Sequence, residues 1–330
     1  MLRGLGILLA TLFAGVTALV MSPRLVTKLV EVAFDRDNRR VARAMAPHVP
    51  VGSHSRLDLS YRAGDPAATL DVHRPTGVTG PLPVVVWVHG GGWVSGDKSD
   101  VAPYLKILCL NSRIPLAAVG LNYSKGPHAQ YPTALRQIDA AFSYLRAHAD
   151  DLGLDLGRVV LAGDSAGAQL ASQYAAMVTD HVFAADVGLA PTLTATQLRG
   201  VVLHCGVYDL ESFRHAPLVV RWGFSRVMWA WTGRLDIAEN RALAQMSTVR
   251  TATVGFPPAM ITGGNGDPLT ANQSRPFAAR LTELGVPSTV LFYDDDHAPA
   301  LLHEFQFNLG GADGPVTLER TLSFLTDRLS

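Results

Sequence analysis

The sequence predicts an α/β fold with a mostly parallel central sheet that is flanked by helices. Two observations lead to this expectation: apolar, strand-like runs recur along the chain, and stretches with helical periodicity separate them. A strand buried on both faces reads as a continuous apolar run, and its alternation with helices is typical of parallel sheets. The predicted strands are residues 83–88, 115–121, 158–163, 199–205, 258–262 and 287–293, and the predicted helices are about 100–112, 132–148, 166–179 and 270–284.

Two further regions modify this plan. Residues 57–61 and 69–75 alternate polar and apolar side chains, which predicts a hairpin at one edge of the sheet. Residues 206–257 form a connection of 52 residues, which is too long for a simple crossover. We interpret this insertion as a helical cap or lid that walls a pocket, and an ordinary helical insertion with its own small core is the alternative. Its large side chains include Trp222, Phe224, Met228, Trp229 and Trp231.

The composition describes a globular chain with a large core. Hydrophobic residues make up 48% and charged residues 17%, which excludes a disordered protein. The formal net charge is zero and no long basic run follows the N-terminal region, so a nucleic-acid partner is not expected. Cys109 and Cys205 lie in or beside apolar runs, and we expect them to be buried free thiols. No Cys/His spacing resembles a zinc site, and neither a metal nor a cofactor is expected.

The N-terminus differs in kind from the rest. Leu5 to Met21 is a run of 17 residues without a charge, and as a helix it would be about 26 Å long. That length is marginal for a bilayer core of about 30 Å, so we favour an uncleaved membrane anchor. A cleaved signal, giving a secreted or periplasmic protein, and a buried helix are the alternatives. The expected organisation is a hydrophobic segment over 1–23, an amphipathic helical linker or cap over 24–54, and the main domain over 55–330.

A candidate nucleophile lies between a predicted strand and a predicted helix. The strand ends at Ala162, the helix begins near Ala166, and Gly163-Asp164-Ser165-Ala166-Gly167 stands between them. This is G-x-S-x-G in the strand–turn–helix context that the motif requires. Ser165 would occupy a strained turn that holds its hydroxyl above the sheet edge, beside the N–H groups of the helix.

A serine hydroxyl is a weak nucleophile and needs a base that is itself oriented by an acid. Where G-x-S-x-G forms such a turn, the acid and then the histidine follow the serine along the chain. Asp267 follows a late strand and a glycine-rich turn, and Asp209 is its rival, one strand too early. For the base we predict His297, four residues after the last strand, over His303, which we expect inside a following helix.

A glycine-rich loop follows the strand 83–88. His89-Gly90-Gly91-Gly92 removes three side chains in a row, which suits a phosphate, a tight turn or a developing oxyanion. The phosphate interpretation is weak, because G-x-x-x-x-G-K-[ST] is absent and no ribose-binding acid follows a G-x-G-x-x-G in context.

Together these motifs resemble the α/β-hydrolase fold esterases of the hormone-sensitive-lipase type. The extended stretch Trp93-x-x-Gly96-Asp97-Lys98 is more similar to the branch that contains feruloyl and carboxyl esterases, arylformamidases and prenylcysteine esterases. The resemblance covers roughly residues 55–330, and its motifs are specific for fold and nucleophile but not for substrate.

The resemblance implies a role for each matching residue. Ser165 would attack an acyl carbon, His297 would move the proton, and Asp267 would hold the imidazole tautomer. The backbone N–H groups of Gly91, Gly92 and Ala166 would bind the oxyanion.

Two neighbours of the glycine loop have supporting roles in the same interpretation. His89 would be structural and anchor the loop. Trp93 would wall the pocket, with simple packing as the alternative.

The expected activity is hydrolysis of small or medium carboxylic esters through an acyl-enzyme. An amidase, arylformamidase or acyltransferase could use the same triad, and a catalytically inactive, membrane-tethered binding protein is a remote alternative. The expected partners are a small-molecule ester and, through the N-terminal segment, a membrane.

Overall fold

The computed structural model describes residues 22–330. The predicted hydrophobic segment Leu5 to Met21 lies outside the described residues, so neither the anchor nor its alternatives are addressed there. Within residues 22–330, no helix combines the length and the apolar character that a membrane crossing needs.

A single twisted sheet organises the chain, with strand order β1-β2-β4-β3-β5-β6-β7-β8. The pairings β1–β2 and β2–β4 are antiparallel, and all later pairings are parallel. The predicted parallel sheet and the predicted edge hairpin are therefore both confirmed. The strands are β1 (Ser53–Ser60), β2 (Thr69–Pro75), β3 (Leu82–Val88), β4 (Ala117–Leu121), β5 (Leu154–Asp164), β6 (Leu198–His204), β7 (Ala259–Gly263) and β8 (Ser288–Phe292).

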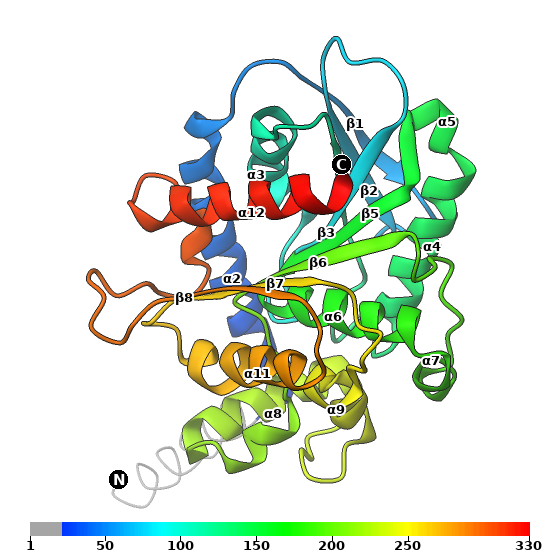
Figure 1. The fold of residues 1–330 in the computed structure, drawn as a ribbon. Helices are drawn as coiled ribbons and strands as arrows, with labels where there is room; N and C mark the ends of the chain where they lie inside the picture. The colour runs from blue at the N-terminus through cyan, green and yellow to red at the C-terminus, as the bar shows by residue number, and fades with distance from the viewer. Residues whose placement is uncertain (1–21) are drawn as a thin grey trace, which may run out of the picture.

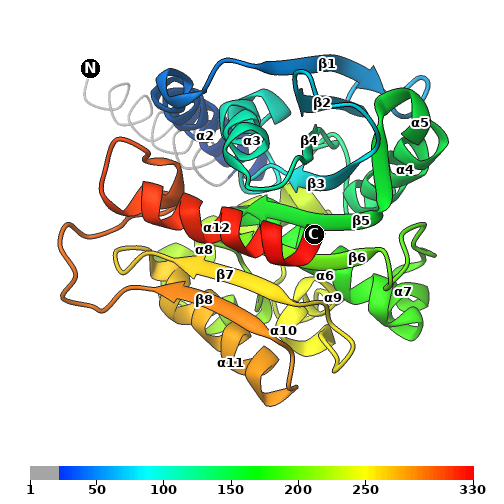
Figure 2. The same cartoon turned by 45° about the horizontal axis from the view of Figure 1, so that its top comes forward.

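Helices cover both faces of the sheet because the central strands are apolar on both sides (Figure 2). Val85 and Trp87 of β3 pack with α3 (Lys98–Asn111) and α12 (Asp313–Leu329). Val84 and Val86 point the opposite way, into the larger core. That face is covered by α4 (Thr133–Ala147), α6 (Ser165–Thr179) and α11 (Arg275–Glu283), with the short α5 (Ala149–Leu152) and α7 (His181–Val187) at its margin.

The long insertion is helical, as expected. It contains η2 (Glu211–His215), α8 (Leu218–Thr232), α9 (Arg241–Met246) and α10 (Thr248–Thr251). Met228 and Trp231 of α8 are buried in the main core, whereas Trp222 and Phe224 are only partly buried. The insertion is thus anchored by one face of α8, and it has no separate core among the buried clusters of residues 22–330.

The helix predicted after the hydrophobic segment is also present, as α2 (Pro23–Met45), followed by η1 (Ala46–His48). It packs against α3 and α8 (Figure 1), and Thr27 Oγ1 donates to the carbonyl of Arg226 over 3.2 Å. Residues 23–45 therefore form a second part of the cap.

Candidate active site

Ser165 stands on the predicted sharp turn. β5 ends at Asp164, α6 begins at Ser165, and the backbone of Ser165 has φ +51°, a strained value for a residue with a side chain. The helix can approach the sheet this closely only because Gly167 has no side chain: a Cβ there would lie 2.0 Å from the carbonyl oxygen of Val88. The turn thus lifts the hydroxyl above the carboxyl ends of the parallel strands.

A continuous hydrogen-bond chain leads away from that hydroxyl. His303 Nε2 lies 2.9 Å from Ser165 Oγ, and His303 Nδ1 lies 2.7 Å from Asp267 Oδ2. The carboxylate is buried, and its other oxygen accepts the N–H of Leu269 over 2.9 Å. The imidazole side chain is 38% exposed, so part of the ring is in contact with solvent. Ser165, His303 and Asp267 are therefore linked in one hydrogen-bond chain, the arrangement that a nucleophile, its base and an orienting acid require.

The predicted base, His297, is not part of this hydrogen-bond chain, so the prediction that His297 contacts Ser165 is wrong. His297 closes a turn directly after β8, where its N–H donates to the carbonyl of Asp294. Its Nε2 lies 3.2 Å from Asp313 Oδ2 at the start of α12. The polypeptide reaches Asp267 only six residues after His297, and the histidine at that point is His303.

The expectation that His303 belongs to a helix is also wrong. Residues 298–304 form a loop of bends and turns, and the next helical element is the short η4 (Phe305–Phe307). Asn265 holds this loop: its Nδ2 donates to the carbonyl of His297, and its Oδ1 accepts the N–H of Leu301. Asp209, the rival acid, caps the start of η2 through the N–H of Ser212 instead.

The glycine loop lies beside the nucleophile with its amides available. Gly91 has φ +110°, a conformation that side chains disfavour, and a Cβ there would lie 2.4 Å from the carbonyl oxygen of Ser95. Within residues 22–330, the N–H groups of Gly91 and Gly92 donate to no backbone carbonyl. Ala166, in the first turn of α6, has a helix-terminal N–H that no earlier carbonyl of the helix can accept.

His89 and Trp93 hold this loop from both ends. His89 Nδ1 donates to the carbonyl of Gly90 over 2.7 Å, and its ring stacks on Tyr123. Burial lowers the pKa of His89 to about 4, so this histidine stays neutral. Trp93 is buried, donates to Gln169 Oε1 over 3.0 Å and packs near Trp231 of the cap.

Negative charge dominates the surroundings of His303. Burial lowers its pKa, but the hydrogen bond to Asp267 and the charge of Glu304 outweigh this effect and raise the pKa to about 9. Glu304 Oε1 lies 3.8 Å from His303 Nε2. The imidazolium form of His303 is therefore well stabilised.

Cys205 adjoins the triad and was not predicted to do so. A ligand atom of Cys205, one of Asp267 and one of His303 lie within 4.8 Å of one another, which is compact enough for a metal ion. Burial and the charge of Asp267 raise the pKa of the Cys205 thiol well above its usual range. A metal-binding cysteine must lose its proton, and Asp267 and His303 already pair with each other. The cluster is therefore better suited to proton transfer than to metal binding.

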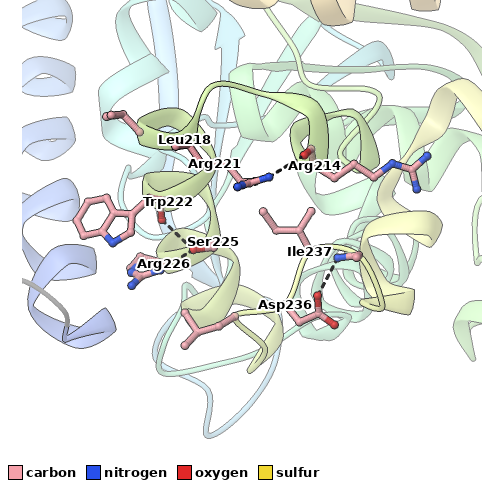
Figure 3. A pocket seen from close by; sticks show the side chains of 11 residues that line it. Arg214, Leu218, Arg221, Trp222, Ser225, Arg226, Asp236 and Ile237 are labelled. Carbon is pink, nitrogen blue, oxygen red and sulfur yellow. Dashed lines mark hydrogen bonds between the residues drawn. The ribbon is translucent and has the colours of Figure 1, made fainter.

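Two cavities lie in and under the cap. One, of about 570 Å³, lies between Phe213 and Val220 of the cap and Pro268 and Leu269, which directly follow Asp267. The other, of about 740 Å³, lies along α8 and combines aliphatic side chains with three arginines (Figure 3). Its arginines are Arg214, Arg221 and Arg226.

Comparison with known proteins identifies the family. A family model described as alpha/beta hydrolase fold matches residues 85–305, so the chain belongs to this family. It is 27% identical over 269 residues to an esterase of Fusarium pseudograminearum, covering 79% of this chain and 76% of the relative. It is 30% identical over 219 residues to the carboxylesterase NlhH of Mycobacterium tuberculosis, covering 65% of each chain.

A solved structure shares the same fold. Esterase B of Lactobacillus rhamnosis superimposes with a TM-score of 0.77 at 22% identity, covering 92% of this chain and 96% of that one.

Proposed function

We propose that this protein hydrolyses carboxylic esters through an acyl-enzyme formed on Ser165. The observation that carries the proposal is the unbroken hydrogen-bond chain from Asp267 through His303 to Ser165. The esterase names of its relatives support the same conclusion. Esterase B, which shares the fold, is also described as inhibited by a tributyrin phosphonate, a mimic of an ester's tetrahedral intermediate.

In the first half-reaction, Ser165 Oγ attacks the acyl carbon while His303 Nε2 takes the hydroxyl proton. Asp267 keeps the proton of Nδ1 in place and stabilises the imidazolium. The amides of Gly91, Gly92 and Ala166 receive the oxyanion, and each such donor contributes about 3 kcal/mol in the transition state. His303 then protonates the leaving alcohol, and a water molecule repeats the sequence to release the acid.

The test compares the wild type with Ser165→Ala on p-nitrophenyl acetate and butyrate, together with labelling by a fluorophosphonate probe. We expect the variant to fold, to lose turnover and to take up no label. A folded variant that is still labelled would show that another residue is the nucleophile. Formamides, amides and acceptor alcohols tested beside the esters separate a hydrolase of esters from an arylformamidase, amidase or acyltransferase.

We also propose that the segment Leu5 to Met21 keeps the enzyme at a membrane. Its 17 uncharged residues support this, as does the exposure of Leu29 and Val32 on α2, which begins just after it. The full-length protein should sediment with membranes and resist extraction by salt and by alkaline carbonate. Release by salt alone would argue against an anchor.

A further inference from the structure

Two acidic residues flank the triad in the sequence, and they meet in space. Asp164 directly precedes Ser165, and Glu304 directly follows His303. Their carboxyl groups converge on Gly90, the first glycine of the loop: a Cβ built there would lie 2.3 Å from Asp164 Oδ2 and 3.0 Å from Glu304 Oε1. We call these two residues the Asp164–Glu304 pair. It joins the nucleophile turn, the base and the oxyanion loop at one point.

Asp164 is held rigidly in this position. Its side chain is buried, Oδ1 accepts the indole N–H of Trp87 over 2.7 Å, and Oδ2 accepts the N–H of Gly90 over 2.8 Å. Burial, and then the charge of Glu304, raise the pKa of Asp164 well above its usual range. Ionising Asp164 beside a second carboxyl group is costly, so Asp164 favours its protonated form.

Glu304 has a backbone conformation that favours glycine. Its φ is +59° and its ψ is 30°, in the left-handed region, where a side chain is disfavoured. Such strain persists only where the surroundings over-determine it. The next residue, Phe305, is buried and packs in a small cluster with Cys205 and Leu301, which fixes the backbone on both sides of the glutamate. This backbone places the carboxylate 3.8 Å from His303 Nε2.

We propose that Glu304 is a positioning residue for the proposed ester hydrolysis: paired with Asp164, it ties His303 to the Gly90 loop and holds one negative charge beside the imidazole. The inference rests on the proposed function, because it gives Glu304 a role only if His303 serves as the base. Asp164 is the more deeply buried of the two, and Glu304 is the one whose carboxylate lies 3.8 Å from His303 Nε2.

The other titratable groups around the pair leave Glu304 as the charge that most directly faces Nε2. The pair, His89 and Asp100 of α3 line one small cavity of about 20 Å³. Burial holds His89 neutral, and burial raises the pKa of Asp100 to about 6. The remaining residues that line this cavity, among them Asn38 and Val41 of α2, are uncharged. On the opposite side of the imidazole, Asp267 acts through Nδ1.

The test is the pH profile of kcat/KM for Glu304→Gln in the full-length protein. Glutamine keeps a hydrogen-bonding group next to Asp164 but removes the charge. We therefore expect the acid limb of the profile to move to lower pH by roughly one unit, with the plateau rate within about threefold of wild type. Glu319→Gln, an exposed change on α12, is the control and should leave the profile unmoved.

A second variant separates charge from backbone geometry. Glu304→Gly relieves the left-handed strain and removes the link to Asp164, so the same shift of the limb should accompany a loss of roughly tenfold in kcat. If either variant folds and its acid limb stays at the wild-type pH, the proposal is overturned. A lower plateau with an unmoved limb also overturns it, because that result describes a merely structural role.

Labelling by a fluorophosphonate keeps this test distinct from that of the proposed function. Wild type and Glu304→Gln should both be labelled at Ser165. If the wild type is not labelled, the assignment of the nucleophile fails. If both are labelled and the limb does not move, only the role of Glu304 fails.

Discussion

His303 Nδ1 lies 2.7 Å from Asp267 Oδ2, although 36 residues separate the two in the chain. The contact depends on the loop between β8 and η4, which passes over the turn after β7. Two hydrogen bonds of Asn265, and one from the N–H of Gly266 to the carbonyl of Leu301, hold the two segments together. The base is thus positioned by loop-to-loop contacts and not by the end of a strand.

The first prediction separates the two candidate histidines. His303→Ala should lower kcat/KM for p-nitrophenyl butyrate by about 10⁴, because loss of one triad member removes most of the acceleration that the triad supplies. His297→Ala loses only the contact with Asp313 and the packing on Tyr293, and should stay within about threefold of wild type. Steady-state kinetics on both variants measure this, and the reverse order would return the base to His297.

The second prediction concerns pH. Asp267 and Glu304 stabilise the imidazolium of His303, so its pKa lies at about 9, above the ordinary value of 6.5. Only the neutral imidazole can accept the proton of Ser165, so activity is lost as pH falls through this pKa. The profile of kcat/KM between pH 5 and 10, corrected with Ser165→Ala as the blank, should rise towards the alkaline end. An acid limb at or below 6.5 would contradict the electrostatic description.

The fold could be predicted from the sequence because its signals are local and strong. β3 and residues 159–162 of β5 read as continuous apolar runs, and the helices between the parallel strands have the expected periodicity. The nucleophile turn was also predictable, since G-x-S-x-G fell where a strand gave way to a helix of small residues. In these cases the pattern and the tertiary structure are set by the same few residues.

The base could not be predicted in the same way. His297 lies nearer the strand end, and the sequence also suggested a helix around His303, so both criteria favoured His297. The position of His303 is set by the hydrogen bonds of Asn265 to the loop and by the burial of Phe305 beside Cys205. Both are contacts between segments that lie far apart in the sequence. One feature of the sequence favours His303: it lies two residues before Phe305, and a large apolar residue can anchor the end of a loop.

The third prediction concerns Lys98, which lies in the segment that suggested an esterase branch. Its Nζ lies 2.7 Å from Asp71 Oδ1 and 2.7 Å from Asp58 Oδ1, and the Lys98 and Asp71 side chains are each 6% exposed. Lys98→Met would leave the carboxylate of Asp71 buried without a cation, which should lower the free energy of unfolding by about 3 kcal/mol. Urea unfolding measures the difference.

The matched control for Lys98 is an ion pair at the surface. Lys28 pairs with Glu31 on α2, and its side chain is 63% exposed. Lys28→Met should change the free energy of unfolding by less than about 0.5 kcal/mol, because water screens the pair. Equal effects of the two substitutions would show that the buried ion pair does not secure the β1–β2 hairpin to α3.

The last prediction tests whether α2 supports the oxyanion loop. A Cβ on Gly92 would lie 2.8 Å from Phe34 Cε2, so the ring rests directly on the loop, and Asp35 Oδ1 accepts the N–H of Gly96 nearby. Phe34→Ala should let the Gly91 and Gly92 amides move away from the oxyanion position. Complete loss of one oxyanion donor would raise the activation free energy by about 3 kcal/mol. We expect a partial loss, which corresponds to a fall of roughly tenfold in kcat with KM nearly unchanged.

Leu29→Ala is the control for Phe34, because Leu29 lies on the same helix and is 62% exposed. It should leave both constants at their wild-type values. Saturation kinetics on p-nitrophenyl butyrate distinguish the outcomes: a fall in kcat for Phe34→Ala alone supports a loop held by the cap. An increase in KM with constant kcat would instead place Phe34 in substrate binding, since a contact made equally in ground and transition states affects only KM.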